Sequence, residues 1–191
     1  MLETTVSRDL NSLVWDQLER IADANPDFRE AFETYVQQYG HDKIRASEPT
    51  ELRSSLVPVV LIVGRNCVLT YDDSQRQVKG TLGSVTVSPG EMYVIGRREP
   101  QDSKLIAWHP TGGVELREYN SSVDTIPSRV HGLFANLDEG RMICTDLGSS
   151  AGTILVGQSK NLGGPFVRIY DPGSEDKSSI KLQRIYTSNT F

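Results

Sequence analysis

Two patterns of hydrophobic positions divide this chain. Within residues 1–40 these positions recur at steps of three and four, which is typical of amphipathic helices. The first stripe is Leu10, Leu13, Val14, Leu18, Ile21 and Ala22, and the second is Phe28, Ala31, Phe32, Tyr35, Val36 and Tyr39. Asn25-Pro26 supplies an N-cap and a first-turn proline between them, and Gly40 ends the second stripe. The pattern predicts an N-terminal helical hairpin as a first domain, residues 1–48.

The two stripes of this hairpin need a hydrophobic partner besides each other, because exposing apolar helix faces to water is unfavourable in free energy. That partner is either the rest of the chain or a second copy, which would give a homodimer through the N-terminal helices. We favour packing within the chain. The polar segment 41–55, with Pro49 and Ser54-Ser55, is predicted to connect the hairpin to the next domain.

From Leu56 onward the hydrophobic residues form short β-branched and aromatic runs, separated by turn residues such as Pro89-Gly90. The runs predict strands at Leu56–Val63, Cys67–Tyr71, Gln77–Leu82, Val85–Val87, Met92–Gly96, Lys104–Trp108, Val114–Tyr119, Gly132–Leu137, Arg141–Thr145, Thr153–Val156, Phe166–Tyr170 and Ile180–Tyr186. Many short strands with dense turns are typical of sandwiches and barrels. We therefore predict a mainly β fold: a β-sandwich of two antiparallel sheets over residues 56–191, preceded by the helical hairpin.

Composition and charge narrow the functions. The 191 residues carry a formal net charge of −5, which argues against the broad basic surface that nucleic-acid binding needs. No N-terminal apolar stretch reads as a signal peptide, and the longest apolar run, Leu56–Val63, is short and contains Pro58. We expect a cytoplasmic protein with no nucleic-acid partner and no membrane partner.

The cysteines and histidines indicate no metal or cofactor. Cys67 and Cys144 lie inside apolar strand-like segments, where a free thiol behaves as a small buried hydrophobe, although a disulfide between them stays open. The three histidines are scattered, and the chain has neither a CxxC nor an HExxH pairing that could set a tetrahedral site.

Three short segments carry the residue types that recognise a phosphate. They are Tyr93-Val94-Ile95-Gly96-Arg97, Ser128-Arg129-Val130-His131-Gly132 and Asp146-Leu147-Gly148-Ser149-Ser150-Ala151-Gly152-Thr153. A phosphate monoester carries nearly two negative charges and three acceptor oxygens, so its receptor needs guanidinium groups, hydroxyls and backbone N–H groups on converging loops. Arg97, Ser128, Arg129 and Ser150 supply these groups, and the planar guanidinium fork suits paired, charge-assisted hydrogen bonds.

Taken together and in this order, the segments resemble the forkhead-associated (FHA) domain, a β-sandwich whose loops bind phosphothreonine peptides. The resemblance covers roughly residues 91–157. It implies that the phosphopeptide is bound by Arg97, Ser128, Arg129 and Ser150. It also implies that the site is supported, through loop hydrogen bonds and tight backbone geometry, by Gly96, His131, Gly132, Gly148, Ser149 and Gly152.

One position departs from the family pattern. Ala151 stands where the family usually has an asparagine that hydrogen-bonds the backbone of the bound peptide, and a methyl group cannot make those contacts. Phosphopeptide binding is therefore expected to be weaker than is usual for the family. The interval between Arg97 and Ser128 is also long, which places extra residues beside the recognition loops.

The resemblance implies an adaptor that binds threonine-phosphorylated protein segments, with a phosphorylated protein or a Ser/Thr kinase as its partner. The alternative is a degenerate FHA-like scaffold that mediates phospho-independent assembly, which Ala151 favours. Ser128, His131 and Asp146 are also the residue types of a hydrolase triad. Serine and histidine three apart on one turn seldom reach that geometry, however, and no GxSxG elbow is present. We therefore predict no enzymatic activity.

Overall fold

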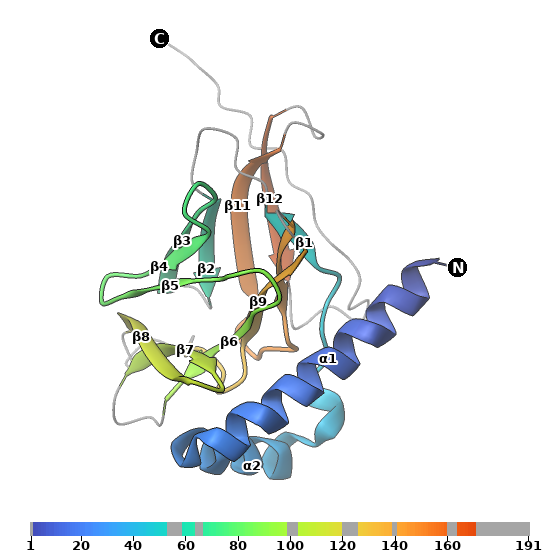
Figure 1. Cartoon of the computed structure of the whole chain (residues 1–191), viewed down its shortest axis with the longest axis vertical. Helices are drawn as coiled ribbons and strands as arrows, with labels where there is room; N and C mark the ends of the chain where they lie inside the picture. The colour runs from blue at the N-terminus through green and yellow to red at the C-terminus, as the bar shows by residue number, and fades with distance from the viewer. Residues whose placement is uncertain are drawn as a thin grey trace.

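The computed structural model describes residues 2–52, 59–63, 67–98, 103–119, 126–138, 141–159 and 164–170. Two helices, α1 (Leu2–Ala24) and α2 (Pro26–Tyr39), and one 3-10 turn, η1 (His41–Lys43), come first (Figure 1). The strands that follow are β1 (Thr50–Leu52), β2 (Val59–Val63), β3 (Cys67–Asp72), β4 (Gln77–Lys79), β5 (Ser84–Thr86), β6 (Met92–Arg97), β7 (Lys104–His109), β8 (Gly112–Glu118), β9 (Gly132–Asp138), β10 (Arg141–Asp146), β11 (Thr153–Ser159) and β12 (Gly164–Tyr170).

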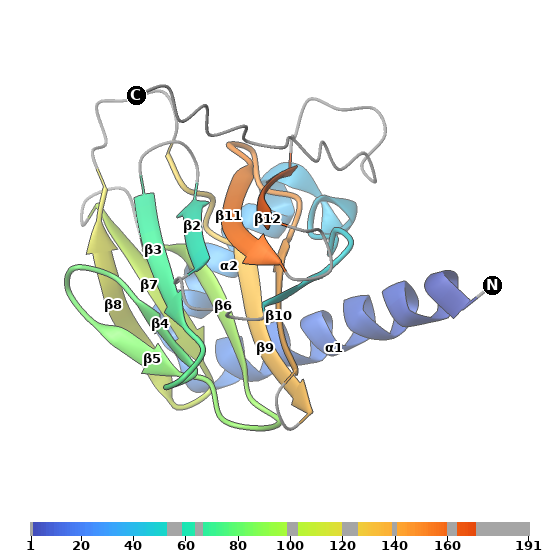
Figure 2. The same ribbon diagram turned by 90° about the horizontal axis from the view of Figure 1, so that it is seen from above.

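The strands form two antiparallel sheets, which we call sheet A and sheet B. Sheet A has the strand order β1-β10-β9-β6-β7-β8, and sheet B has the order β12-β11-β2-β3-β4-β5. Figure 2 shows the two sheets as separate layers, with the helices beside sheet A. The fold is thus mainly β with antiparallel sheets, as the sequence predicts.

The inner strands of sheet A are buried on both faces, which explains why they read as nearly continuous apolar runs. In β6, Ile95 belongs to a hydrophobic cluster shared with sheet B, whereas its neighbour Val94 belongs to a cluster shared with the helices. In β9, Phe134 faces sheet B while Leu133 packs in the cluster with the helices. Successive residues of a strand point to opposite faces, so this alternation needs a hydrophobic layer on each side.

The helical hairpin supplies that second layer. Leu18 and Ile21 of α1 and Phe28 of α2 are fully buried in one cluster with Trp108 of β7, and the ring centroids of Phe28 and Trp108 are 5.3 Å apart. The packing of the apolar stripes within the chain is therefore confirmed. Two stripe positions do not take part, because Leu13 and Tyr39 are 47% and 49% exposed.

The junction between the helices follows the expected capping pattern only in part. Asn25 is the N-cap of α2 and Pro26 is its first residue, but the Asn25 side chain makes no capping hydrogen bond. Its Nδ2 donates instead to the carbonyl of Ile21, at 2.9 Å, and to that of His109, at 3.3 Å. The residue thus fixes the hairpin against the end of β7.

The segment 41–55, predicted as a connection, also contributes a strand to sheet A. Thr50–Leu52 forms β1, which pairs with β10 at the edge of sheet A, and Ile44 and Ala46 are buried. β1 also meets β12 of sheet B: the hydroxyls of Thr50 and Tyr170 are 2.9 Å apart, and Arg168 contacts the Thr50 hydroxyl. Sheet A therefore begins before residue 56.

The remaining predicted strands between residues 59 and 170 each overlap a strand of the structure, and Ile180–Tyr186 lies outside the described residues. Cys67 and Cys144 are both free and buried, so the disulfide is ruled out. Burial raises the pKa of the Cys67 thiol to about 11. No helix in the described ranges has the length and apolar character needed to cross a lipid bilayer.

Candidate functional site

Arg97 lies at the end of β6, next to the loop that carries Ser128. The Arg97 N–H donates to the carbonyl of Ser128 at 3.0 Å, and the His131 N–H donates to the carbonyl of Ile95 at 2.8 Å. Between these two bonds, a Cβ on Gly96 would stand 1.8 Å from the carbonyl oxygen of Arg129. Glycine is therefore required at position 96, because only a residue without a side chain lets β6 and residues 128–131 approach this closely.

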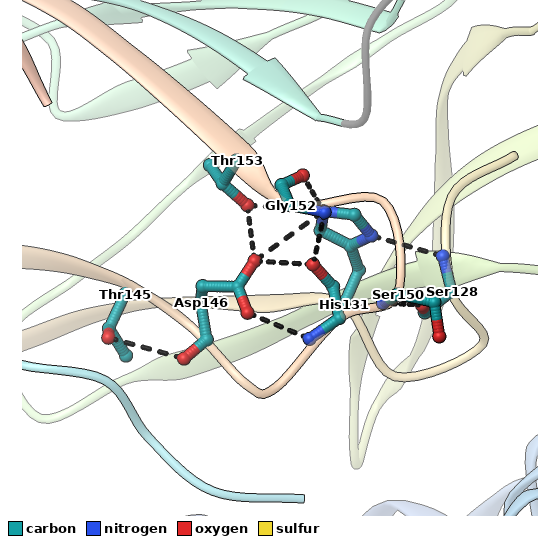
Figure 3. A network of polar contacts seen from close by, with 8 residues as sticks. Ser128, His131, Thr145, Asp146, Ser150, Gly152 and Thr153 are labelled. Atoms are coloured by element: carbon teal, nitrogen blue, oxygen red, sulfur yellow. Dashed lines mark hydrogen bonds and ion pairs between the residues drawn. The ribbon is translucent and has the colours of Figure 1, made fainter. Parts of the chain in front are cut away.

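His131 joins two of the three segments and is almost completely buried, with 1% of its surface exposed. Its Nδ1 accepts the Ser128 N–H at 3.0 Å, so the ring hydrogen is on Nε2, which donates to the carbonyl of Gly152 at 2.9 Å (Figure 3). Burial lowers the pKa of His131, and the nearby Asp146 carboxylate and the Gly152 carbonyl only partly oppose this. A neutral imidazole thus holds the loops together, in the supporting role that the sequence predicts.

Asp146 organises the third segment around its carboxylate, which is 4% exposed. Oδ1 accepts the Ser149 N–H at 2.8 Å, and Oδ2 accepts the hydroxyls of Ser149 and Thr153, each at 2.6 Å (Figure 3). The Ser149 hydroxyl in turn accepts the Gly152 N–H at 3.0 Å. The loop is thereby fixed from inside, and Ser150 projects at its exposed tip.

The second and third segments meet at Ser128. The Ser150 N–H donates to the Ser128 Oγ at 3.0 Å, so the Ser128 hydroxyl oxygen connects the two loops directly. Ser128 is 7% exposed, Ser150 is exposed, and Arg97 and Arg129 are half-buried. All four predicted binding residues therefore come from backbone segments in contact with one another, although Ser128 lies deeper than a loop-tip residue would.

The guanidinium group of Arg97 differs from that of an ordinary surface arginine because its Nε is buried. The Arg97 Nε is buried and has no hydrogen-bond acceptor among the described residues. A buried donor without an acceptor costs free energy, and such groups are uncommon in folded proteins. The Arg97 Nε–H is therefore available to donate a hydrogen bond to a bound ligand.

The arrangement of Ser128, His131 and Asp146 differs from that of a hydrolase triad. The imidazole Nδ1 is occupied by the backbone N–H of Ser128, and Asp146 lies on the Nε2 side, 3.8 Å away. Neither ring nitrogen is placed to take a proton from the Ser128 hydroxyl, which a nucleophilic serine requires. In the part of the chain that the structure describes, no three His, Cys, Asp or Glu side chains gather in a group that could hold a metal ion.

The helical hairpin and its connection also touch the site, which the sequence does not predict. A Cβ on Gly148, whose φ is +76°, would stand 2.1 Å from the carbonyl oxygen of Lys43. The Ser47 N–H donates to the carbonyl of Asp146 at 2.9 Å, and the Thr145 hydroxyl donates to the carbonyl of Ser47 at 2.7 Å. Residues 43–47 therefore form one wall of the third segment.

Tyr35 of α2 lies near the second and third segments. Its side chain is 2% exposed and packs in one cluster with Val130 and Leu147. Burial raises the pKa of Tyr35 to about 12, against smaller opposing effects of the Ser128 hydroxyl and the Arg129 charge. The Ser128 side chain and the Arg129 charge thus both act on the Tyr35 hydroxyl, which stays protonated at neutral pH.

Comparisons with protein-family models, curated proteins and solved structures give no match for this chain. The resemblance to FHA domains therefore rests on the three segments themselves. Its implications for function are developed below as a proposal.

Proposed function

We propose that the protein is an FHA-like adaptor that binds phosphothreonine in a partner protein, such as a substrate of a Ser/Thr kinase or the kinase itself. In this proposal the two antiparallel sheets are the two layers of an FHA-like β-sandwich. The observation that carries the proposal is the hydrogen bond from the Ser150 N–H to the Ser128 Oγ. It connects two segments that are remote in sequence and that both carry predicted phosphate ligands.

Charge and hydrogen-bonding capacity at the junction support an anionic ligand. Arg97 and Arg129 each carry a positive charge, and the Ser128 and Ser150 hydroxyls can donate hydrogen bonds. The buried Arg97 Nε has no acceptor among the described residues. A phosphate dianion supplies several strong acceptor oxygens at once, so it suits this donor-rich group better than a neutral side chain does.

The test is a titration of the full chain with fluorescent phosphothreonine peptides of varied flanking sequence and with their unphosphorylated twins. We expect measurable binding only of the phosphorylated forms. Arg97→Ala is expected to weaken this binding about tenfold or more, since a hydrogen bond to a charged group contributes about 1.5–3 kcal/mol. Arg20→Ala removes the same charge from an exposed position on α1, outside the three segments, and is the matched control.

The second candidate function is a phospho-independent scaffold of the same fold. Two observations favour it: Ser128 is only 7% exposed, and Ala151 cannot make the peptide-backbone contacts of an asparagine. Equal affinity for phosphorylated and unphosphorylated peptides would support this alternative and reject phosphate recognition.

A further inference from the structure

Tyr35 carries a buried hydroxyl that does not stabilise the fold through a well-formed hydrogen bond to the described residues. The side chain is 2% exposed, and its oxygen makes no hydrogen bond of ordinary geometry among the described residues, although the Ser128 side chain is close enough to lower the pKa of the tyrosine. Most buried polar groups in proteins do have a partner, and an unpaired one destabilises the fold. Phenylalanine would fill the same space without this cost, so the hydroxyl calls for an explanation.

The position of this hydroxyl gives the explanation. Tyr35 lies in one hydrophobic cluster with Val130 and Leu147, which belong to the second and third segments of the proposed site. The Ser128 side chain and the Arg129 charge both act on the Tyr35 hydroxyl, and the Arg97 Nε is another buried donor without an acceptor among the described residues. Two buried donors near Ser128, the Tyr35 hydroxyl and the Arg97 Nε, are therefore available to an acceptor from outside the chain.

We propose that Tyr35 is a fifth ligand of the anion site, contributed by α2, whose hydroxyl donates a hydrogen bond to an oxygen of the bound phosphate. This inference rests on the proposed function, because it names a further residue of that same site. Burial has already removed water from the hydroxyl, so the bond to a charged acceptor forms without further desolvation of the tyrosine. The phosphate approaches from the side of Ser150, the exposed member of the site.

The helical hairpin then belongs to the recognition module. The FHA resemblance does not extend to residues 1–48, so it does not imply this contribution. It depends on the packing of α2 against sheet A, which places Tyr35 and Val130 in the same hydrophobic cluster. Peptide binding and hairpin docking are thereby coupled through one side chain.

Tyr35→Phe tests the inference, because it removes only the hydroxyl and keeps the ring. We expect the variant to bind a phosphothreonine peptide about tenfold more weakly than wild type. Tyr39→Phe is the matched control: Tyr39 is 49% exposed, its ring centroid is 5.0 Å from that of Tyr35, and its loss should change affinity by less than about twofold. Both variants should unfold at the same denaturant concentration as wild type or a higher one.

A second readout separates a ligand from a merely structural residue. In full-length protein with 13C-labelled tyrosine rings, the Cζ resonance of Tyr35, assigned by its absence from Tyr35→Phe, should shift when the phosphopeptide is added. The unphosphorylated twin should leave it unmoved. Equal or tighter binding by Tyr35→Phe, or an unmoved resonance in wild type saturated with phosphopeptide, would overturn the inference and leave the proposed function standing. Absence of any phosphopeptide binding by wild type would reject the proposed function, and this inference with it.

Discussion

Gly96→Ala is a severe test of how the first two segments are joined. A Cβ added at this position would stand 1.8 Å from the carbonyl oxygen of Arg129 and 2.6 Å from its carbonyl carbon, and both are backbone atoms. Real Cβ contacts of this kind are not below 3.0 Å, so the backbones must separate by more than 1 Å. Rotation of a flexible side chain cannot relieve this overlap.

The energetic consequence follows from the bonds on either side. Separating the strands lengthens the 3.0 Å bond from the Arg97 N–H to the Ser128 carbonyl and the 2.8 Å bond from the His131 N–H to the Ile95 carbonyl. Overpacking costs about 1–3 kcal/mol and each of the two buried bonds about 1 kcal/mol, so we expect a loss of about 3–5 kcal/mol in the free energy of unfolding. Phosphopeptide affinity should fall as well, because Arg97 moves away from Ser128.

Urea unfolding followed by fluorescence measures this loss, with the denaturant slope as a check on two-state behaviour. Gly90→Ala is the control, because its added Cβ meets nothing within 4 Å and only the positive φ of +82° disfavours alanine. That strain costs about 1 kcal/mol. Unfolding of Gly96→Ala at the wild-type urea concentration would refute the close approach of the two segments.

Three further predictions concern the site and the assembly. Ala151→Asn should tighten phosphopeptide binding about 2–10-fold by restoring a peptide-backbone hydrogen bond, as measured by the same titration; unchanged affinity would mean a different peptide path. Because burial lowers the pKa of His131, the unfolded chain binds its proton more tightly than the folded chain does. The free energy of unfolding should therefore be highest above pH about 6.5 and fall as the solution is acidified, by up to about 1.4 kcal/mol per pH unit. His131→Gln should lose this component of the slope while His41→Gln, at an exposed position, keeps it; an identical slope in both would reject the assignment. Light scattering of the full chain should give the mass of one copy, since the helical stripes are largely buried against sheet A, and a concentration-independent dimer would contradict this.

The helices and most strands could be predicted because their hydrophobic periods are set by local geometry. β1 was missed for a physical reason: Thr50–Leu52 is only three residues long, follows Pro49, and becomes a strand through its pairing with β10. Such pairing is a tertiary effect that a polar local sequence does not show. Leu13 and Tyr39 lie on the predicted stripes and are nevertheless exposed. The spacing of apolar residues identifies the face of a helix that packs on the protein, but it does not show how much of that face the rest of the protein covers.

The sequence predicts which residue types form the candidate site, but it predicts only some of the contacts that hold those residues in place. The order of the three segments indicated that Arg97, Ser128 and Ser150 meet, and the supporting role of His131 agrees with its two ring hydrogen bonds. The anchoring role of Asp146 was missed, although an aspartate three residues before a serine is a typical signal for a side chain that accepts a backbone N–H. No such signal indicates that Tyr35 lies near the site. The apolar stripe on α2 predicts that this residue is buried, but it does not show which residues surround it.

A double-mutant cycle on phosphopeptide affinity tests the central claim, that these segments form a single anion site, most directly. Arg97→Ala, Ser128→Ala and the double variant would be titrated with the same phosphothreonine peptide by calorimetry. If both side chains hold one phosphate, each single change weakens binding and the double change weakens it by less than the sum, with a coupling of about 1 kcal/mol. Losses that add without coupling, or wild-type affinity in either single variant, would contradict the claim.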